Sequence, residues 1–391
     1  ALISNEAGDQ LRSYQYRGRD LSLAYKHFLS PLAERCLVVT PQSMAPNLIT
    51  FLGLLISMAS SCVFWYVCPD WVSVDAPRWV FPLMGASLFI YQTLDNMDGK
   101  QARRTSTGSA LGLLFDHGCD AINATFGAFI LIAIVSAGRS LPVVAACYGN
   151  NAFPFFFATW EHYYTHELVL PVINGPSEGV LIGVLLSVLT YFVGPAFWAQ
   201  PVPLPLPPVA AAFIVRVAGP ASLAPPMWTI FMAGSYVGII ATVAIQMTNV
   251  LRLRRKQGLS LLTPLRDCTG FALIWVVAGQ WLMTHPELFW RHPGCCLFLV
   301  GALNTEANVA LMLAHMTEQT FRPFRPALLP LLLGWANSCL LPAPAVDEDS
   351  LLVMLAVLMQ VLVGGYIVKM VLEMRDHLNI YVFSTQKRKL Q

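Results

Sequence analysis

The sequence predicts an all-α polytopic membrane protein with about ten transmembrane helices, and two observations support that fold class. Only 12% of the 391 residues are charged, whereas a soluble globular protein carries about 25%. Residues of the set AVILMFWYC make up 56% of the chain, and they gather into ten apolar stretches. A helix needs about 20 apolar residues to cross the hydrocarbon core, which most of these stretches supply. This composition excludes a water-soluble enzyme, a nucleic-acid-binding protein and a disordered chain.

The order of the elements follows from where the apolar stretches begin and end. A cytosolic or interfacial N-terminal segment, residues 1–45, contains a mildly amphipathic stretch from Leu21 to Leu37, which we expect to lie as a helix along the membrane surface. The transmembrane domain follows over residues 46–375, and a basic cytosolic tail over 376–391 ends the chain. The ten expected spans are 47–68, 79–98, 107–137, 141–163, 177–198, 226–251, 261–284, 294–317, 326–342 and 350–374.

Basic residues set the expected orientation of these spans. With a cytosolic N-terminus, twenty of the 24 Lys and Arg residues fall in cytosolic segments or at the span ends beside them. The four that fall on the other side are Arg78, Arg139, Arg216 and Arg291. Because cytosolic loops are enriched in Lys and Arg, we expect both termini in the cytosol. The net charge is only +2, so no strong field indicates a nucleic acid or another polyanionic partner.

Acidic residues at membrane depth are the first indication of chemistry, because charge there is costly and marks function. Residues 91–120 read YQTLDNMDGKQARRTSTGSALGLLFDHGCD. Asp95 and Asp98 are three residues apart at the end of one expected helix, and Asp116 and Asp120 are four apart near the start of the next. Each spacing places its pair on one helix face. The short turn between the helices brings them side by side, so we expect the four carboxylates to converge.

Four carboxylates in one pocket repel one another, and a hard divalent cation relieves that repulsion. Two such ions about 3.5–4 Å apart are the usual arrangement for displacement at phosphorus. Arg103 is then a natural partner for a phosphate oxygen, and His117 lies within reach of the same pocket, where the unperturbed pKa of histidine, about 6.5, suits a general base. The alternative is that the carboxylates form ion pairs with Lys100, Arg103 and Arg104 at a solvated helix end.

This segment resembles the CDP-alcohol phosphotransferase signature, DxxDGxxAR(x8)GxxxDxxxD, without a gap. The matching positions are Asp95, Asp98, Gly99, Ala102, Arg103, Gly112, Asp116 and Asp120. The strings APNLIT at 45–50, GKQARRT and FDHGCD are similar to the eukaryotic choline/ethanolamine phosphotransferase branch, and the tract 160–170 is similar to its fungal members. One position departs from that branch, because Leu113 stands where its members carry Glu. Leu113 lies outside the signature and indicates an altered acceptor or an engineered site.

The resemblance implies a reaction in which phosphocholine or phosphoethanolamine passes from CDP-choline or CDP-ethanolamine to diacylglycerol, giving a phospholipid and CMP. It also implies a homodimer in the endoplasmic reticulum or Golgi membrane, with the active site facing the cytosol.

Residue roles are also implied by this resemblance. Two Mg²⁺ or Mn²⁺ ions would be held by Asp95, Asp98, Asp116 and Asp120. The CDP moiety would be contacted or closely approached by Asn47, Gly99, Ala102, Arg103 and Gly112. His117 is the implied proton acceptor, and Asp120 is the alternative base of the wider family. We favour His117, because a carboxylate that binds a metal ion is a poor base near neutral pH.

Two other functions stay open at this point. In a transporter the carboxylates would bind a cation in transit, although such proteins tend to show inverted repeats, and no repeat is evident here. A phosphotransferase with a soluble acceptor, such as inositol or glycerol phosphate, would call for extra basic residues in the pocket, and none is obvious.

Polar side chains also occur in two later expected spans. The fourth span ends in the cluster Glu161, His162, His166 and Glu167, which indicates either structural contacts or recognition of the substrate head group. In the eighth span Asn304, Asn308 and His315 share one helix face, with Glu306 on another side. For these we expect packing contacts or the lining of a lipid path, not a second active site.

Overall fold

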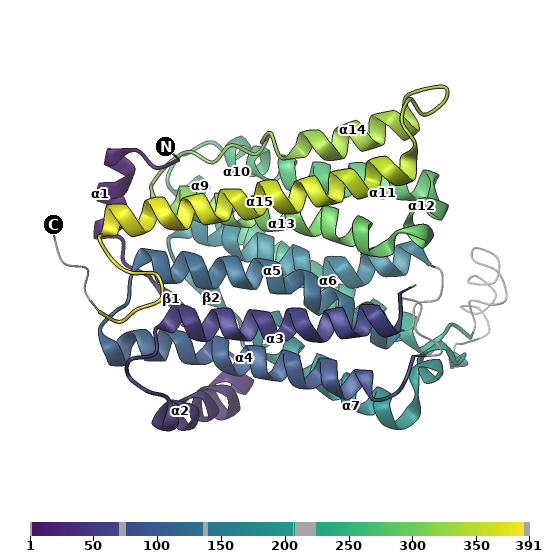
Figure 1. Cartoon of the computed structure of the whole chain (residues 1–391), viewed down its shortest axis with the longest axis horizontal. Coiled ribbons are helices and arrows are strands. Elements are labelled where there is room, and N and C mark those ends of the chain that lie inside the picture. Colours follow the sequence, from purple (N-terminus) through teal and green to yellow (C-terminus); the bar gives the residue numbers. More distant parts are fainter. Residues whose placement is uncertain (1, 70–75, 136–139, 206, 208–223, 387–391) are drawn as a thin grey trace.

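Long helices run side by side along the longest axis of the molecule, and short helices and connections lie at its two ends (Figure 1). The computed structural model describes residues 2–69, 76–135, 140–205, 207 and 224–386. In these residues the only sheet has two short strands. The expected all-α class is therefore confirmed.

The N-terminal half of the chain contains the elements that form the candidate site. In chain order they are α1 (Asn5–Ser13), β1 (Gly18–Asp20), the π-helical turn η1 (Tyr25–Leu29), α2 (Ser30–Val39), α3 (Pro46–Val67), α4 (Val80–Thr105), α5 (Ala110–Val135), α6 (Leu141–Thr165), β2 (Leu168–Leu170), the π-helical turn η2 (Gly175–Gly179) and α7 (Val180–Val193).

The C-terminal half adds helices that surround and support these. They are the 3-10 turn η3 (Pro195–Ala199), α9 (Met227–Lys256), α10 (Leu262–Asp267), α11 (Thr269–Thr284), α12 (Pro286–Arg291), α13 (Pro293–Met316), α14 (Leu328–Cys339) and α15 (Glu348–Leu378). Helices α3, α12 and α13 each begin with proline, which suits the first helical position because its missing N–H would have no intrahelical partner there.

Every one of the ten expected spans contains a helix in the structure. Among the described residues, six helices are long and apolar enough to cross a membrane by themselves: α3, α5, α7 with η2, α9, α13 and α15. By contrast, α14 has 12 residues and rises only about 18 Å, well short of the roughly 30 Å hydrocarbon core. The exact number of spans therefore stays a prediction.

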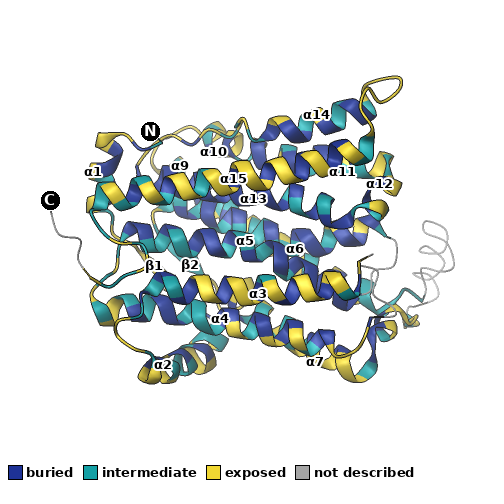
Figure 2. Ribbon diagram, viewed as in Figure 1, coloured by how far each residue is buried: buried dark blue, intermediate teal, exposed yellow. Residues whose placement is uncertain are grey.

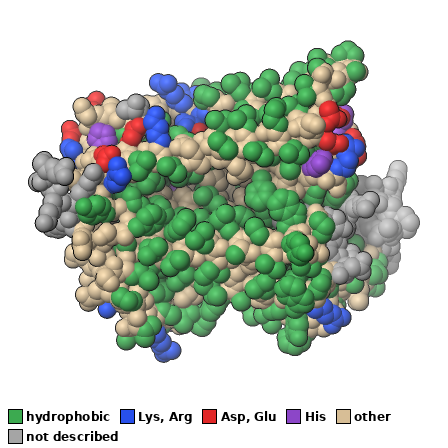
Figure 3. All heavy atoms as spheres, viewed as in Figure 1, with side chains coloured by type: hydrophobic (Ala, Val, Ile, Leu, Met, Phe, Trp, Pro, Cys, Tyr) green, Lys and Arg blue, Asp and Glu red, His purple; other side chains and the backbone are tan. Residues whose placement is uncertain are grey.

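The distribution of side chains over the surface is that of a membrane protein. Hydrophobic side chains cover the middle of the face seen in Figure 3, and charged side chains gather toward the two ends of the helices. The exposed side of α15 is correspondingly apolar, with Val357, Val361 and Leu362 at the surface. A band of this kind suits contact with lipid tails, and we conclude that the chain is an integral membrane protein.

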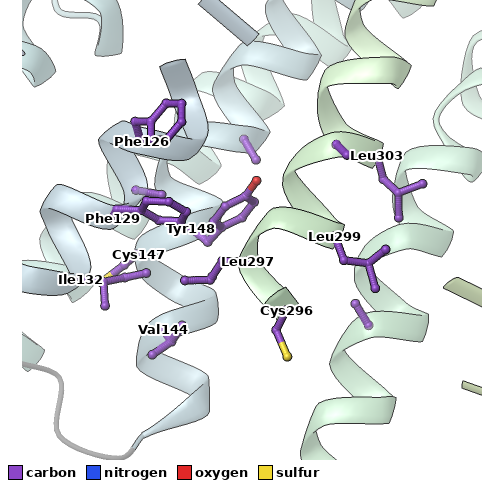
Figure 4. Packing of buried hydrophobic residues seen from close by; sticks show 14 of the residues in the cluster. Phe126, Phe129, Ile132, Val144, Cys147, Tyr148, Cys296, Leu297, Leu299 and Leu303 are labelled. Atoms are coloured by element: carbon purple, nitrogen blue, oxygen red, sulfur yellow. The ribbon is translucent and has the colours of Figure 1, made fainter. Parts of the chain in front are cut away.

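Two helices occupy the interior of the bundle. The most apolar 18-residue windows of α5 and α13 are 78% and 89% buried, whereas that of α9 is 11% buried. Figure 2 shows this contrast between inner and outer helices. Leu297 of α13 points toward Tyr148 of α6 and toward the side where Phe126 and Phe129 of α5 lie, whereas Leu299 points to the other side of α13 (Figure 4). This core holds α5 in place from behind, and α5 carries half of the candidate site.

The turn between α4 and α5 is short because both helix ends are capped locally. Ser106 has a left-handed backbone (φ 54°) and its N–H bonds to the carbonyls of Ala102 and Arg103. At the start of α5, the Ser109 hydroxyl oxygen accepts the N–H of Gly112 at 3.1 Å. The C-terminal turns of α4 therefore lie beside the N-terminal turns of α5, as the sequence predicted.

The N-terminal arm, which we define as residues 14–21, contains a strand that the sequence analysis did not predict. β1 pairs in parallel with β2, with Gly18 opposite Leu168. Arg19 of the arm forms an ion pair with Glu167 at 2.6 Å. A three-residue strand has too little periodicity to be recognised in a sequence, because its pairing depends on the tertiary fold.

The amphipathic stretch expected before the first span is helical over η1 and α2, and it carries exposed apolar side chains at Phe28, Val38 and Val39. Its place at a membrane surface stays a prediction. Arg139, Arg216 and the last five residues of the basic tail lie outside the described residues.

Candidate active site

Four aspartates from two neighbouring helices form the candidate site, which we call the carboxylate cluster. Asp95 and Asp98 lie on α4, and Asp116 and Asp120 lie on α5. One carboxylate oxygen from each of Asp95, Asp116 and Asp120 can be chosen so that all three lie within 4.8 Å of one another. The convergence that the spacing predicted is therefore present for these three residues.

Hydrogen bonds from two other side chains orient two carboxylates of the cluster. The hydroxyl of Thr50, on α3, donates to Asp98, which is buried. The hydroxyl of Tyr91, one turn before Asp95 on α4, donates to Asp120 at 2.7 Å. The sequence analysis missed both residues. Tyr91 could have been found, because position i–4 from Asp95 lies on the same helix face.

The cluster has no basic partner among the described residues. Lys100 instead bonds to Glu34 of α2 at 2.8 Å, and Arg104 bonds to the carbonyls of Leu37 and Thr40 at 2.7 and 3.0 Å. These two cations connect α4 to α2 and point away from the carboxylates. The alternative of a cluster neutralised by Lys100, Arg103 and Arg104 therefore fails for Lys100 and Arg104, and no ion pair joins Arg103 to the four aspartates in the described part of the chain.

The chemistry of the cluster fits a divalent metal ion. One oxygen each of Asp95 and Asp116 is buried and has no hydrogen-bond partner in the described part of the chain. Buried carboxylate oxygens need either donors or a cation, since isolated buried charge is strongly unfavourable. Hard cations such as Mg²⁺ prefer carboxylate ligands, so the orphaned oxygens of the cluster suit such an ion.

Residues expected to contact a nucleotide lie on the α3 and α4 side of the cluster. Arg103 is exposed, and its guanidinium lies over Gly99. A Cβ atom added to Gly99 would be 3.7 Å from Nη1 of Arg103. A Cβ atom added to Gly112 would likewise be 3.5 Å from the side-chain amide oxygen of Asn47. Asn47 also donates to the carbonyl of Val382 at 2.9 Å, a contact with the C-terminal tail that the sequence did not predict. Ala102 contributes its carbonyl to the cap of α4.

His117 points toward α6, on the other side of the cluster from Asn47. Its Nε2 lies 2.8 Å from the Thr159 hydroxyl, and its ring stacks on Phe155 with centroids 4.7 Å apart. The Thr159 hydroxyl donates to the Phe155 carbonyl at 2.9 Å, so it accepts from His117 Nε2–H. In a neutral imidazole this leaves Nδ1 as the acceptor nitrogen. Thr159 is a further residue of the site that the sequence analysis missed.

A second group of polar rings, which we call the histidine cluster, lies beside the carboxylate cluster and consists of His162, His166 and His315. The His162 and His315 rings are 4.2 Å apart, and those of His166 and His315 are 5.3 Å apart. The Tyr14 hydroxyl lies 3.2 Å from His315 Nε2. A cavity of about 420 Å³, lined in part by Tyr14, Arg17, His166 and His315, opens beside these rings.

The acidic residues near the histidine cluster take part in structural contacts. Glu161 accepts from Asn249 at 2.8 Å, and Glu167 pairs with Arg19 of the arm. On α13, Glu306 forms an ion pair with Arg325, and Asn308 bonds to the Asn304 carbonyl. Packing contacts were the expectation for α13, and these pairs fit it.

Comparison with known proteins agrees with this geometry. A family model described as CDP-alcohol phosphatidyltransferase matches residues 43–237. Choline/ethanolaminephosphotransferase 1 of Arabidopsis thaliana is 33% identical over 97% of this chain and 97% of its own. Choline/ethanolaminephosphotransferase 1 of Saccharomyces cerevisiae is 37% identical over 48% of this chain and 47% of its own. Cholinephosphotransferase 1 of Danio rerio is 30% identical, over 88% and 85% respectively.

Proposed function

The chain belongs to the CDP-alcohol phosphatidyltransferase family, and from this premise we propose that it transfers phosphocholine or phosphoethanolamine from the CDP ester to diacylglycerol. The products are phosphatidylcholine or phosphatidylethanolamine, and CMP. Similarity to choline/ethanolaminephosphotransferases over nearly the whole chain supports this substrate class.

The carboxylate cluster is the observation that carries the proposal. Its four aspartates come from two helices joined by a short turn, and its buried oxygens have no cationic partner among the described residues. A pyrophosphate ester brings further negative charge into the same space. Substrate can therefore bind there only with added positive charge, which the protein's own Lys100 and Arg104 do not supply.

Asp95, Asp98, Asp116 and Asp120 would hold the divalent ions, two Mg²⁺ or Mn²⁺ in our proposal. Bound there, such ions neutralise the pyrophosphate and stabilise the charge that develops on the departing CMP. Thr50 and Tyr91 orient two of the carboxylates by donating hydrogen bonds to them.

The remaining roles belong to residues on either side of the cluster. Arg103 and Asn47 would contact the CDP moiety, with Gly99, Ala102 and Gly112 allowing it to approach the helices closely. His117 would accept the proton of the diacylglycerol hydroxyl at Nδ1, while Thr159 holds Nε2. The hydroxyl oxygen then forms a bond to the β-phosphorus in line with the bond to CMP, which breaks. Asp120 is the alternative base.

We further propose that ten spans place both termini and the carboxylate cluster at the cytosolic side of an endoplasmic reticulum or Golgi membrane. The charge pattern of the sequence supports this orientation. Arg254 at the end of α9 lies over the ring of Tyr164, 5.7 Å from its centroid, which brings a basic helix end close to the end of α6. A homodimer is proposed from the family resemblance alone.

One assay tests the function. The purified protein is given diacylglycerol, Mg²⁺ and either CDP-choline or CDP-ethanolamine, and CMP and phospholipid are measured together. We expect both products in equal amounts with at least one of the two nucleotides. Transport of a cation without release of CMP would instead support a transporter, and release of CMP only with a soluble alcohol would move the acceptor to a different class.

A further inference from the structure

One face of α6 lies against the proposed active site and carries a histidine that the proposed mechanism does not use. Phe155, Thr159 and His162 stand at i, i+4 and i+7, which places them on the same face of the helix. Phe155 and Thr159 both contact His117. His162 therefore continues this face by one turn, toward the N-terminal arm.

His162 is 1% exposed, and neither of its ring nitrogens has a hydrogen-bond partner in the part of the chain that the structure describes. A neutral imidazole carries one donor and one acceptor. Leaving both unpaired inside a protein is costly, and such groups in native proteins usually bind water, an ion or a ligand. The buried nitrogens of His162 are thus able to bond to a group from outside the described chain, such as a ligand that enters beside α6.

Tyr16 of the N-terminal arm covers His162. Its ring meets the His162 ring edge-on, with centroids 6.1 Å apart and an angle of 78° between the planes. The Tyr16 ring is folded back over Gly18, where a Cβ atom would collide with the tyrosine hydroxyl. Tyr16 is 50% exposed, so its ring can turn aside and uncover the imidazole.

His162 also lies close to the proposed active site. Thr159, which bonds to His117, precedes His162 by three residues on α6, and His117 directly follows Asp116 of the carboxylate cluster in sequence. Partial burial raises the pKa of Tyr16 to about 12, and the negative charges of Asp116 and Asp20 add to this shift, which fits a place for Tyr16 on the same side. Tyr16 and His162 are therefore near the place where the pyrophosphate is proposed to bind.

The shape of the substrate places its head group in this space. A CDP-alcohol carries its nucleoside and its amino alcohol at opposite ends of two phosphates. In the proposed function the nucleoside end lies on the side of Asn47 and Arg103, which is formed by α3 and α4. The amino alcohol must then extend to the opposite side of the cluster, where α6 and the arm lie.

We infer that His162, covered by Tyr16, recognises the head group and favours the primary ammonium of CDP-ethanolamine over the trimethylammonium of CDP-choline. This inference rests on the proposed function. The acceptor nitrogen of His162 can take an N–H from a primary ammonium, whereas a trimethylammonium has no N–H to donate. Asp20 of the arm takes no part in this discrimination, because its carboxylate accepts hydrogen bonds from Ser22, Asn174 and Ser177.

The test measures kcat/KM for the two nucleotides with the full-length protein, diacylglycerol and Mg²⁺. His162→Phe keeps a ring but removes the acceptor, so the ratio of the CDP-ethanolamine value to the CDP-choline value should fall about tenfold or more. His162→Gln keeps an acceptor oxygen and should retain most of the wild-type ratio. His285→Gln is the matched control, because His285 precedes α12 beside Glu287 and Glu348, outside the histidine cluster, and should leave the ratio unchanged.

Each outcome either supports or overturns the assignment of His162 to head-group recognition. An unchanged ratio in His162→Phe, in a preparation where the wild type is active, overturns the assignment of His162. Equal losses in His162→Phe and His162→Gln, without a change of ratio, assign His162 to structure and overturn it as well. If His162→Phe does not fold, His162→Ala has the same expected ratio. A wild type that releases no CMP from either nucleotide contradicts the proposed function instead.

Discussion

The carboxylate cluster and the histidine cluster lie next to each other, yet the chain assembles them in different ways. The carboxylates come from α4 and α5, which a short turn connects. The histidines come from the end of α6 and from α13, which pack on each other, and Tyr14 of the N-terminal arm bonds to His315. The first cluster is charged and needs a cation, whereas the second consists of aromatic rings with unpaired hydrogen-bonding atoms. A local motif thus supplies the proposed reaction centre, and tertiary packing supplies the surface that we propose recognises the head group.

The largest expected effect is at the carboxylates. Asp116→Asn keeps the volume of the side chain but removes a ligand charge, so turnover should fall at least about 10³-fold while the protein still folds. Initial rates at saturating Mg²⁺ measure this. Glu34→Gln is the control, since it removes a carboxylate that pairs with Lys100 on α2 and should leave turnover close to wild type. Normal turnover in Asp116→Asn would remove the metal assignment.

A somewhat smaller effect is expected at His117, which follows Asp116 on α5 and contacts Thr159 and Phe155 of α6. His117→Gln should lower kcat by about 10²–10⁴, the usual contribution of a general base, and should leave CDP-choline binding intact because all four carboxylates remain. Calorimetry on the same preparation supplies the binding control. If Asp120 is the base, the substitution should cost little. Loss of binding together with rate would mean that His117 holds the pocket in shape.

Arg103 should affect binding more than turnover. Arg103→Lys keeps the charge but loses the two-pronged contact with phosphate, so we expect the dissociation constant for CDP-choline to rise about tenfold. Arg104→Lys is the matched control, because Arg104 bonds to carbonyls of α2 and the following residue. Equal affinities in the wild type and Arg103→Lys would show that Arg103 points elsewhere when nucleotide binds.

The smallest effect is expected at the ion pair that holds the arm. Arg19 and Glu167 are both well exposed, with side-chain exposures of 66% and 39%. Such pairs contribute at most about 1 kcal/mol. Arg19→Ala should therefore leave the melting temperature and both kcat/KM values nearly unchanged, because the backbone pairing of β1 with β2 remains. A large change in the ratio of the two nucleotides would show that the ion pair, and not the backbone pairing, positions Tyr16.

The contrast between the clusters also explains what the sequence could and could not predict. Spacings of three and four residues place the aspartates of each pair on one helix face. The short capped turn after α4 places the start of α5 beside the end of α4. The pairing of α4 with α5 and the convergence of Asp95, Asp116 and Asp120 therefore follow from local geometry. Tyr91 follows from the same rule, although it was not singled out.

Other contacts depend on chain segments that are far apart. Thr159 and His162 reach the site only after α6 packs on α5, and Tyr16 reaches it only after β1 pairs with β2. The contact between Asn47 and the Val382 carbonyl joins residues at opposite ends of the chain. No periodicity in a single sequence reports such contacts. The alternative ion pairs with Lys100 and Arg104 depended on their closeness to the aspartates in sequence, and they do not form because both side chains bond to α2 and the residue that follows it.

The most direct test of the account is to count the divalent ions that the carboxylate cluster binds. Mn²⁺ titrated into the purified protein in the presence of CDP-choline can be followed by electron paramagnetic resonance, which separates free from bound ion. We predict two tightly bound Mn²⁺ per chain in the wild type, and loss of at least one in Asp95→Asn and in Asp116→Asn. Tight binding that is unchanged in both variants, or no tight binding in an active wild type, would contradict the assignment of the four aspartates.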